Sequence, residues 1–269
     1  MEFQTAVITG GGGGLGRAFC EELGATRARI VVADIDLAAA EATVALVKRA
    51  GGDGKAVQCD VSDPAQIDAL AATAKAWLGD VDLLVNNAGV AVAGDFAAIG
   101  LAEWQWIMGI NLWGVIYGCR AFVPAMQARR RGAIINVASA AGLLSAPKMA
   151  PYNVTKAAVV ALSETMHAEL ARDGIHVSAL CPTFFRTNIG EASRGPLDPR
   201  MIKLMHSMMD RSKIQAPEVA QAALTAVAKN QLYVVPMADG RAMWRLKRLQ
   251  PQRFYDLLAS KLLRRFTRL

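Results

Sequence analysis

Short apolar runs rich in β-branched residues alternate with longer alanine-rich runs along most of the chain, and this alternation limits the possible folds more than any other feature of the sequence. It is typical of βαβ units, in which parallel strands form one sheet and the intervening helices cover its faces. It predicts an α/β fold with a doubly wound, seven-stranded parallel sheet flanked by helices on both faces. The predicted strands are residues 5–9, 30–33, 56–59, 83–85, 133–137, 176–180 and 232–235, and the predicted helices are residues 15–24, 37–50, 64–78, 101–130, 153–172 and 217–229.

Charge is distributed unevenly along the chain. Its 269 residues carry 30 Lys and Arg against 23 Asp and Glu, a formal net charge of +7. Nine of the basic residues and a single acid, Asp256, fall in residues 241–269, which leaves 21 basic against 22 acidic residues in 1–240. We therefore predict one near-neutral domain at 1–240 and a basic, amphipathic helical extension at 241–269. No nucleic-acid partner is expected, because the basic segment lacks the interleaved aromatic residues of a recognised binding module.

The C-terminal extension has an amphipathic pattern from residue 253 onward. Its apolar and basic residues fall on different sides of a helix, the arrangement of a helix that lies on an anionic membrane surface. The same pattern fits a helix whose apolar side packs on its own domain or on another subunit, and the sequence leaves both alternatives open. The apolar side would hold Phe254, Leu258, Leu262, Phe266 and Leu269, and the basic side Arg253, Lys261, Arg264 and Arg268.

The four cysteines are far apart in the sequence, and neither they nor the three histidines show a metal-ligand spacing. We therefore expect a reduced protein with no metal site. The first residues lack the basic and apolar regions of a secretory signal, and no stretch of about 18 uncharged apolar residues could span a bilayer. A cytoplasmic location is the expectation, with the C-terminal extension as the one candidate for peripheral membrane contact.

A glycine-rich loop at residues 10–16 joins the first predicted strand to the first predicted helix. Glycine lets the backbone turn sharply and approach a pyrophosphate, and the free amides at the helix N-terminus favour the phosphate charge. Asp34 ends the second strand about twenty residues later, where a carboxylate accepts hydrogen bonds from the ribose hydroxyls and repels the 2′-phosphate of NADP. A turn or cap aspartate is the alternative for Asp34, and Arg17 is the one nearby basic residue that argues for NADP. The combination predicts a Rossmann-type dinucleotide site with NAD as the cofactor, NADP being disfavoured.

Tyr152 and Lys156 are four residues apart in a predicted helix, so their side chains project from the same face. A free tyrosine has a pKa of about 10 and is a weak base at neutral pH, whereas an adjacent ammonium group stabilises the phenolate. The pair could therefore exchange a proton with an alcohol or a carbonyl, although this spacing alone also fits an ordinary surface pair. Ser139, after the fifth strand, and Asn-Asn-Ala-Gly at 86–89, after the fourth, favour the catalytic interpretation.

Together these motifs resemble those of the short-chain dehydrogenase/reductase family in its single-domain form, over about residues 3–240. The resemblance implies NAD(H)-dependent hydride transfer between the nicotinamide and a hydroxyl or carbonyl carbon, in a homo-oligomer that is a dimer or a tetramer. A non-catalytic regulator or scaffold that senses NAD is the alternative function. The residues that carry the resemblance are 9–16, Asp34, 59–61, 86–89, Asn111, Ser139, Tyr152, Lys156, Pro182 and Thr187.

The resemblance also implies a role for each matched residue. Tyr152 would be the general acid/base, Lys156 would lower its pKa and bind the nicotinamide ribose, and Ser139 would hydrogen-bond the substrate oxygen. Asn111 would position a water in a proton relay; the alternative, which the sequence alone favours, is a buried helix asparagine satisfied by the backbone. The cofactor would be bound by Gly10, Gly14, Leu15, Gly16, Asp34, Asp60, Val61, Asn87, Ala88, Gly89, Tyr152, Lys156, Pro182, Phe185 and Thr187.

The chain departs from the family pattern after the sixth strand, where Thr183 follows Pro182 in place of the usual glycine. We expect the Thr183 side chain to lie near the nicotinamide. The segments expected around the substrate, residues 90–96, 140–148 and 183–209, are largely apolar, which predicts a hydrophobic secondary alcohol or ketone as substrate. A helical methionine stripe, which either belongs to the core or covers the substrate as a pliable lid, comprises Met201, Met205, Met208 and Met209.

Overall fold

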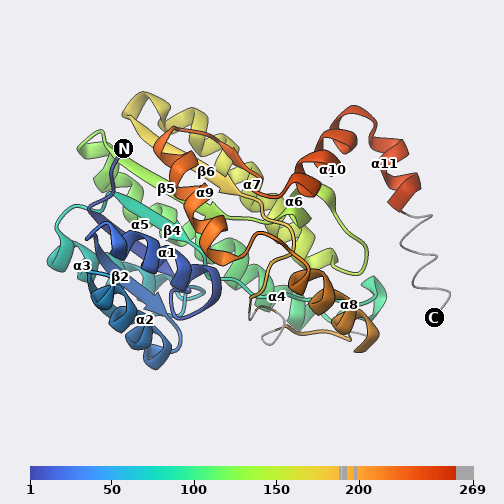
Figure 1. The fold of residues 1–269 in the computed structure, drawn as a ribbon, viewed down its shortest axis with the longest axis horizontal. Helices are drawn as coiled ribbons and strands as arrows, with labels where there is room; N and C mark the ends of the chain where they lie inside the picture. The colour runs from blue at the N-terminus through green and yellow to red at the C-terminus, as the bar shows by residue number, and fades with distance from the viewer. Residues whose placement is uncertain (188, 190–192, 197–198, 259–269) are drawn as a thin grey trace.

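Seven parallel strands form a single sheet in the computed structural model, which describes residues 1–187, 189, 193–196 and 199–258. The strand order is β3-β2-β1-β4-β5-β6-β7, and every neighbouring pair is parallel. The predicted doubly wound sheet is thereby confirmed (Figure 1). Its strands are β1 (Thr5–Thr9), β2 (Arg29–Asp34), β3 (Asp53–Gln58), β4 (Leu83–Asn86), β5 (Gly132–Val137), β6 (Ile175–Leu180) and β7 (Tyr233–Val234).

Helices cover both faces of the sheet because successive residues of a strand point to opposite sides. In β1, Val7 joins the core on one face, whereas Ala6 and Ile8 join the core on the other. The chain runs outward from β1 to β3 and then returns to β4, so the carboxyl ends of β1 and β4 flank the point where open α/β sheets bind ligands. One face is covered by α3 (Pro64–Leu78), α5 (Gly114–Ala128) and α7 (Ala150–Leu170), and the other by α1 (Gly14–Ala25), α2 (Leu37–Arg49) and α9 (Ala216–Ala228).

The helix predicted at 101–130 changes its hydrogen-bond register in the middle. α4 (Leu101–Met108) leads into a π turn, η2 (Gly109–Trp113), and α5 follows without a break. The amide of Gly114 bonds to the carbonyl of Gly109, five residues back, which is the π pattern. By length and composition alone this apolar run could cross a membrane, but in the fold it packs against β4, β5 and α3.

Four further helical segments connect these layers. The segment α8 carries the predicted methionine stripe, in which Met209 is buried and Met205 and Met208 are half-buried, so these side chains face the protein. The side chain of Met201 lies outside what the structure describes. The four segments are η1 (Phe96–Ala98), α6 (Ala140–Leu144), η3 (Ala171–Asp173) and α8 (Pro199–Asp210).

The C-terminal segment packs on the domain as far as the structure describes it. The boundary predicted at residue 240 falls inside α10 (Ala238–Leu249), and α11 (Pro251–Leu258) follows. Phe254 is only 3% exposed and joins a core cluster that half-buried Leu258 also contacts. This part of the predicted apolar side is therefore covered by protein, which does not support membrane attachment through it. Outside the described residues lie Lys261, Leu262, Arg264, Phe266, Arg268 and Leu269.

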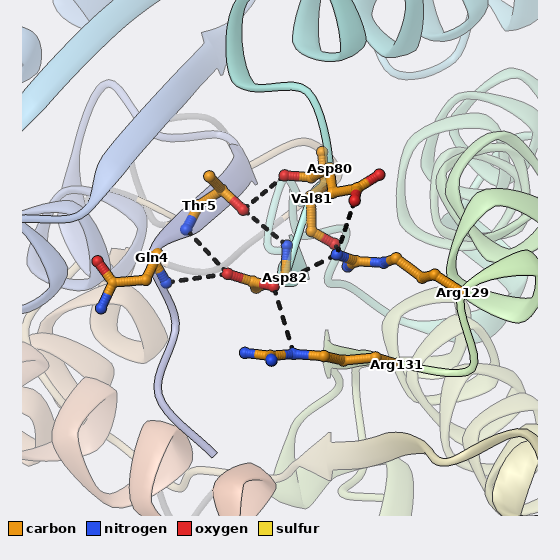
Figure 2. Close-up of polar contacts among 7 residues, drawn as sticks. All are labelled: Gln4, Thr5, Asp80, Val81, Asp82, Arg129 and Arg131. Atoms are coloured by element: carbon orange, nitrogen blue, oxygen red, sulfur yellow. Dashed lines mark hydrogen bonds and ion pairs between the residues drawn. The ribbon is translucent and has the colours of Figure 1, made fainter.

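A charged network ties together the amino-terminal edge of the sheet (Figure 2). Asp82 is 7% exposed just before β4, and its Oδ2 accepts hydrogen bonds from the amides of Gln4 and Thr5 at 3.0 and 3.3 Å. Its Oδ1 lies 3.4 Å from Arg129 Nη1 and 3.7 Å from Arg131 Nε. These contacts join the end of α5 to the first strand, at the opposite strand ends from the glycine loop. This edge anchors the fold, and the predicted site residues lie at the carboxyl edge.

Candidate active site

Several positions of the glycine loop tolerate no side chain. Gly10 and Gly14 have φ values of +60° and +52°, a region that other residues rarely adopt. A Cβ on Gly16 would lie 2.1 Å from the carbonyl oxygen of Gly10, and a Cβ on Gly12 would lie 2.8 Å from Asp34 Oδ2. The loop thus brings the start of α1 directly against the ends of β1 and β2.

The N-terminus of α1 fits an anionic group. Its N-cap residue, Gly13, supplies no side-chain cap, and a Cβ added there would meet nothing within 4 Å. Among the described residues, no atom accepts a hydrogen bond from the amides of Gly14, Leu15 or Gly16. Free amides at the positive end of a helix dipole are the partners that a pyrophosphate needs. The residues present therefore fit a dinucleotide.

Asp34 ends β2 at the edge of this loop. Its Oδ2 accepts from the amide of Gly12 at 2.8 Å, and its Oδ1 accepts from the amide of Asp36 at 3.0 Å. The side chain that caps α2 belongs to Asp36, whereas Asp34 accepts from the amide two residues on and so also stabilises the turn between β2 and α2, as in the turn alternative. Arg17, the basic residue that argues for NADP, donates to Thr43 Oγ1 at 3.1 Å and to the carbonyl of Gly12 at 2.5 Å. Its guanidinium is therefore engaged by α2 and the loop.

The turn after β4 is bonded to the glycine loop. Asn87 Nδ2 donates to the carbonyls of Thr9 and Gly10, both at 2.9 Å. Thr9 Oγ1 in turn accepts from the amides of Asn87 and Ala88 at 3.0 and 3.2 Å. The two predicted cofactor-binding segments therefore form one connected unit at the ends of β1 and β4.

Asp60 and Val61 follow β3, the neighbour of β2. Asp60 Oδ1 accepts from the amide and the hydroxyl of Ser62 at 2.9 and 2.7 Å. Val61 is buried, and a Cβ on Gly114 would lie 2.8 Å from its Cγ2, so this side chain packs on the start of α5. Both residues thus lie at the same edge as Asp34, and the Val61 side chain also belongs to the core.

Tyr152 and Lys156 lie one turn apart on α7 and are 8% and 3% exposed. Lys156 Nζ is 5.8 Å from the centroid of the Tyr152 ring and donates to the carbonyl of Val137 at 2.7 Å. Ser139 caps α6 by accepting from the amide of Ala141 at 3.1 Å, and its side chain also hydrogen-bonds Tyr152. The structure therefore brings the three residues together at the carboxyl end of β5.

Burial dominates the electrostatics of this group. Desolvation raises the pKa of Tyr152 above its usual value, and the hydrogen bond with Ser139 lowers it in part. Desolvation lowers the pKa of Lys156 to about 8. In the protein alone, burial thus outweighs the stabilisation of the phenolate expected from the Lys156 charge.

Asn111 lies in the π turn and is fully buried. Its Nδ2 donates to the carbonyl of Val90 at 2.9 Å and to Thr155 Oγ1 at 3.3 Å, and its Oδ1 accepts from the amide of Val90 at 2.8 Å. The side chain is thus satisfied within the protein, chiefly by backbone, as in the alternative that the sequence favours. A Cβ on Gly89 would lie 3.3 Å from Asn111 Oδ1 and 3.5 Å from Lys156 Nζ, so Asn111 fixes the turn that borders Lys156.

A separate hydrophobic cluster packs around Tyr152. It includes the buried Val92 and Ile107 and two half-buried tryptophans of α4, Trp104 and Trp106. Sequence reasoning missed the tryptophans, although two such residues close behind the predicted apolar segment 90–96 were a usable signal. The other members are Val90, Ala91, Ile99, Ala141, Met149 and Ile189.

The loop after β6 passes both the catalytic candidates and the glycine loop. The carbonyl of Pro182 accepts from the amide of Ala140, next to the candidate serine, at 2.9 Å. Phe185 is buried in the core, and Thr187 Cβ lies 3.9 Å from where a Cβ on Gly14 would be. Three predicted cofactor contacts thus come from one loop that spans the site.

The Thr183 side chain faces α10, and its place near the nicotinamide stays a prediction. Its hydroxyl donates to Asp239 Oδ1 at 3.3 Å. Its Cγ2 lies 2.7 Å from where a Cβ on Gly240 would be. The methyl and hydroxyl groups that distinguish this residue from glycine are therefore occupied by the first turn of α10.

A buried polar network lies under the catalytic candidates, and sequence reasoning missed it. Asn86 Nδ2 donates to Asn136 Oδ1 at 2.9 Å, and Asn136 Nδ2 donates to Ser163 Oγ at 3.0 Å. The network joins β4, β5 and α7, the elements that carry the 86–89 turn, Ser139 and Tyr152.

Over the described ranges, no group of three or more His, Cys, Asp or Glu side chains could hold a metal ion.

Known proteins are similar to this chain in sequence and in fold. The family model "short chain dehydrogenase" matches residues 4–197. The 3beta-hydroxysteroid dehydrogenase 1 of Eggerthella lenta is 35% identical over 233 residues, which are 86% of this chain and 88% of that protein. The 2-(S)-hydroxypropyl-CoM dehydrogenase 3 of Xanthobacter autotrophicus is 34% identical over 196 residues, 72% of this chain and 77% of that protein.

A solved structure agrees over nearly the whole chain. It is a short chain dehydrogenase/reductase from Burkholderia phymatum in complex with NAD, with a TM-score of 0.87 and 36% identity, covering 94% of this chain and 96% of that one. The chain therefore belongs to the short-chain dehydrogenase/reductase family of oxidoreductases.

Proposed function

We propose that this protein is an NAD(H)-dependent oxidoreductase that transfers a hydride between the nicotinamide and a hydrophobic secondary alcohol or ketone. The observation that carries the proposal is the meeting of Tyr152, Ser139 and Lys156 beside the glycine loop and next to an apolar cluster. A phenol, a hydroxyl and an ammonium group in reach of one another can bind a carbonyl or hydroxyl oxygen and exchange its proton.

Each side chain has a separate task in this proposal. Tyr152 donates a proton to the ketone oxygen in reduction and accepts the alcohol proton in oxidation. Ser139 hydrogen-bonds the same oxygen and holds it beside the phenol. Lys156, with its pKa of about 8, carries its charge in most molecules at neutral pH and favours the phenolate when it forms. A bound NAD supplies the carbon that accepts or returns the hydride.

Preference for NAD follows from the surroundings of Asp34. Its carboxylate is held in place by two backbone amides, so it presents a fixed negative charge where the adenosine ribose would bind. That charge accepts hydrogen bonds from ribose hydroxyls and repels a 2′-phosphate. Arg17 could offset the repulsion only by giving up its bonds to Thr43 and Gly12.

The apolar cluster around Tyr152 supports a hydrophobic substrate. Two tryptophans and Met149 pack against the cluster that contains Tyr152, which makes its surroundings largely apolar. The Eggerthella lenta relative is named for a hydroxysteroid, which is a hydrophobic secondary alcohol. Compounds of that class, aryl ketones and long-chain ketones are the substrates to try first.

We also propose a homo-oligomer, a dimer or a tetramer, in the cytoplasm. Trp113, at the end of the π turn, is 48% exposed and stacks on Tyr117, and Val154, on α7, is 47% exposed. Exposed aromatic and aliphatic side chains on adjoining helices indicate a surface that associates. Light scattering at micromolar concentration measures the assembly directly; a monomer would contradict the proposed oligomer.

The proposed cytoplasmic location is supported by the four cysteines, which are all buried and unpaired, as in a reducing compartment.

The proposed function is tested by turnover with both cofactors. NADH and NADPH formation should be measured over a panel of hydrophobic secondary alcohols, with wild type, Tyr152→Phe and the half-buried control Tyr117→Phe. We expect turnover with NAD, its loss in Tyr152→Phe with NADH binding retained, and little change in the control. Binding of NADH without any Tyr152-dependent turnover would refute the enzyme and favour the non-catalytic sensor.

A further inference from the structure

The helix α10 contacts the active-site scaffold on both sides of Ser139. On one side, Thr183 follows Pro182, whose carbonyl accepts a hydrogen bond from the residue after Ser139. On the other side, Lys247 Nζ donates at 2.7 Å to the carbonyl of Leu143, near the end of the short helix that Ser139 caps. Figure 1 shows α10 beside α6, and the two helices are in contact.

The contact with Thr183 is tight and specific. Gly240 is buried, and its φ is not in the left-handed region, so the space around it, not its backbone, requires a glycine. A Cβ at this position would lie 2.7 Å from Thr183 Cγ2 and 3.2 Å from Val235 Cγ1. Asp239 accepts from the Thr183 hydroxyl at 3.3 Å and from the amide of Gly240 at 2.7 Å. Thr183 therefore sits on a surface shaped for its methyl and hydroxyl groups.

The start of α10 is itself fixed to the sheet. Arg241 Nη1 donates to the carbonyls of Val235 and Pro236 at 2.8 and 2.6 Å, directly after β7. Further along α10, Trp244 packs on the ring of Tyr233, with centroids 4.8 Å apart. A helix held at both places is a rigid support, so its contact with Thr183 restrains the loop after β6.

We propose that α10 is a positioning element of the active site: the contact of Asp239 and Gly240 with Thr183 sets the path of the loop from Pro182 to Thr187 beside Ser139 and the glycine loop. The residue that departs from the family pattern is the one that makes this contact. Thr183 and Gly240 are positioning residues, because the Thr183 side chain faces α10 and Gly240 has no side chain that could reach the reacting groups. The inference rests on the proposed function for its effect on turnover.

A size-complementation experiment tests this inference. Gly240→Ala inserts a methyl group 2.7 Å from Thr183 Cγ2, so the Thr183 side chain must shift, and we expect the loop that carries it to shift with it. Moving a catalytic group by about 1 Å costs roughly ten- to a hundredfold in rate. We expect Gly240→Ala to lower kcat by about that factor and to weaken NADH binding severalfold. Thr183→Ser removes the clashing methyl but keeps the hydroxyl, so the double variant should recover most of both losses.

The exposed Arg245 of the same helix provides the matched control, and Arg245→Ala should leave kcat and NADH affinity unchanged. All variants are assayed as full-length protein at a temperature where circular dichroism shows each to be folded. Normal kcat and NADH affinity in Gly240→Ala, or losses that Thr183→Ser does not reverse, would overturn the inference. If wild type shows no turnover, the proposed function fails instead, and the NADH dissociation constants alone decide the inference by the same pattern of loss and rescue.

Discussion

Truncation of Phe254 to alanine tests whether α11 is part of the folded domain. The side chain is 3% exposed and belongs to a core cluster that Leu258 and Trp244 of the C-terminal segment also contact. Leu249, the last residue of α10, is 81% exposed and is a matched control on the same segment. If the tail were held by a membrane and not by the protein, both truncations would have similar, small effects on stability in water.

The expected magnitude follows from this burial. Removing a phenylalanine ring from water contributes about 2–3 kcal/mol, and the cavity left behind adds to the loss, so Phe-to-Ala changes in cores cost about 3–5 kcal/mol. We expect Phe254→Ala to lower the free energy of unfolding by about 3 kcal/mol, at the lower end, because α11 is short and its neighbours can close part of the cavity. A chain of this size loses roughly 2–4 °C of Tm per kcal/mol, so Tm should fall by about 6–12 °C. Leu249→Ala should change stability by less than about 0.5 kcal/mol.

Urea unfolding followed by circular dichroism measures the difference, with unchanged slopes showing that both variants unfold as wild type does. The reasoning would be refuted by equal midpoints for Phe254→Ala and Leu249→Ala. Flotation with anionic vesicles then completes the comparison, because a docked α11 predicts no vesicle binding by the wild-type chain through this helix.

Three other predictions concern the loop, the thiols and the catalytic pair. Gly16→Ala should lower the Tm sharply, because the new Cβ would lie 2.1 Å from a backbone oxygen. Gly13→Ala should leave the Tm unchanged, because its Cβ would meet nothing within 4 Å. Equal Tm shifts for the two variants by calorimetry would contradict this. Burial raises the pKa of all four thiols, to about 11 or 12 in three of them. Above pH 9 the unfolded chain therefore releases protons that the native protein retains, so the free energy of unfolding should fall as the pH rises. The native pKa of Lys156 is lowered to about 8, so this residue raises stability with pH, but by at most one proton between pH 8 and 10.5. The Tm under reducing conditions should therefore still fall. A flat or rising Tm would contradict the burial of the thiols. A phenol is protonated at neutral pH, and burial raises the pKa of Tyr152 further. The kcat for ketone reduction should therefore hold between about pH 6 and 8 while the kcat for alcohol oxidation rises, and parallel profiles would count against this assignment.

Local rules made the sheet and the cofactor edge predictable. Apolar runs of strand length between amphipathic helices specify parallel strands covered on both faces. In the structure, a positive φ requires glycine at 10 and 14 and a close contact requires it at 16, and the run of glycines is the sequence signal of these requirements. The tyrosine and lysine spacing likewise fixed which helix face they share, whatever the rest of the chain does.

The features that sequence could not predict depend on contacts between distant segments. A π turn of five residues leaves the apolar spacing of a helix nearly unchanged, so the register shift at Asn111 is set by packing, such as that of Gly114 on Val61. The direction of Thr183 depends on Asp239, 56 residues further along the chain. The periodicity of the tail identified an apolar side that includes Phe254, but only the fold shows what covers it.

The pKa directions at the site bear on how it would work. Burial raises the pKa of Tyr152 and lowers that of Lys156, so it shifts each group towards its neutral form. A protonated phenol is the form that would give a proton to a ketone oxygen in the proposed reaction. Alcohol oxidation needs the phenolate. In so buried a site, an anion is stable only with a cation nearby. Lys156 Nζ, 5.8 Å from the centroid of the Tyr152 ring, provides that cation while it remains protonated. The same burial that keeps water from the reacting atoms therefore makes the alcohol-oxidising state depend on the charge of one lysine.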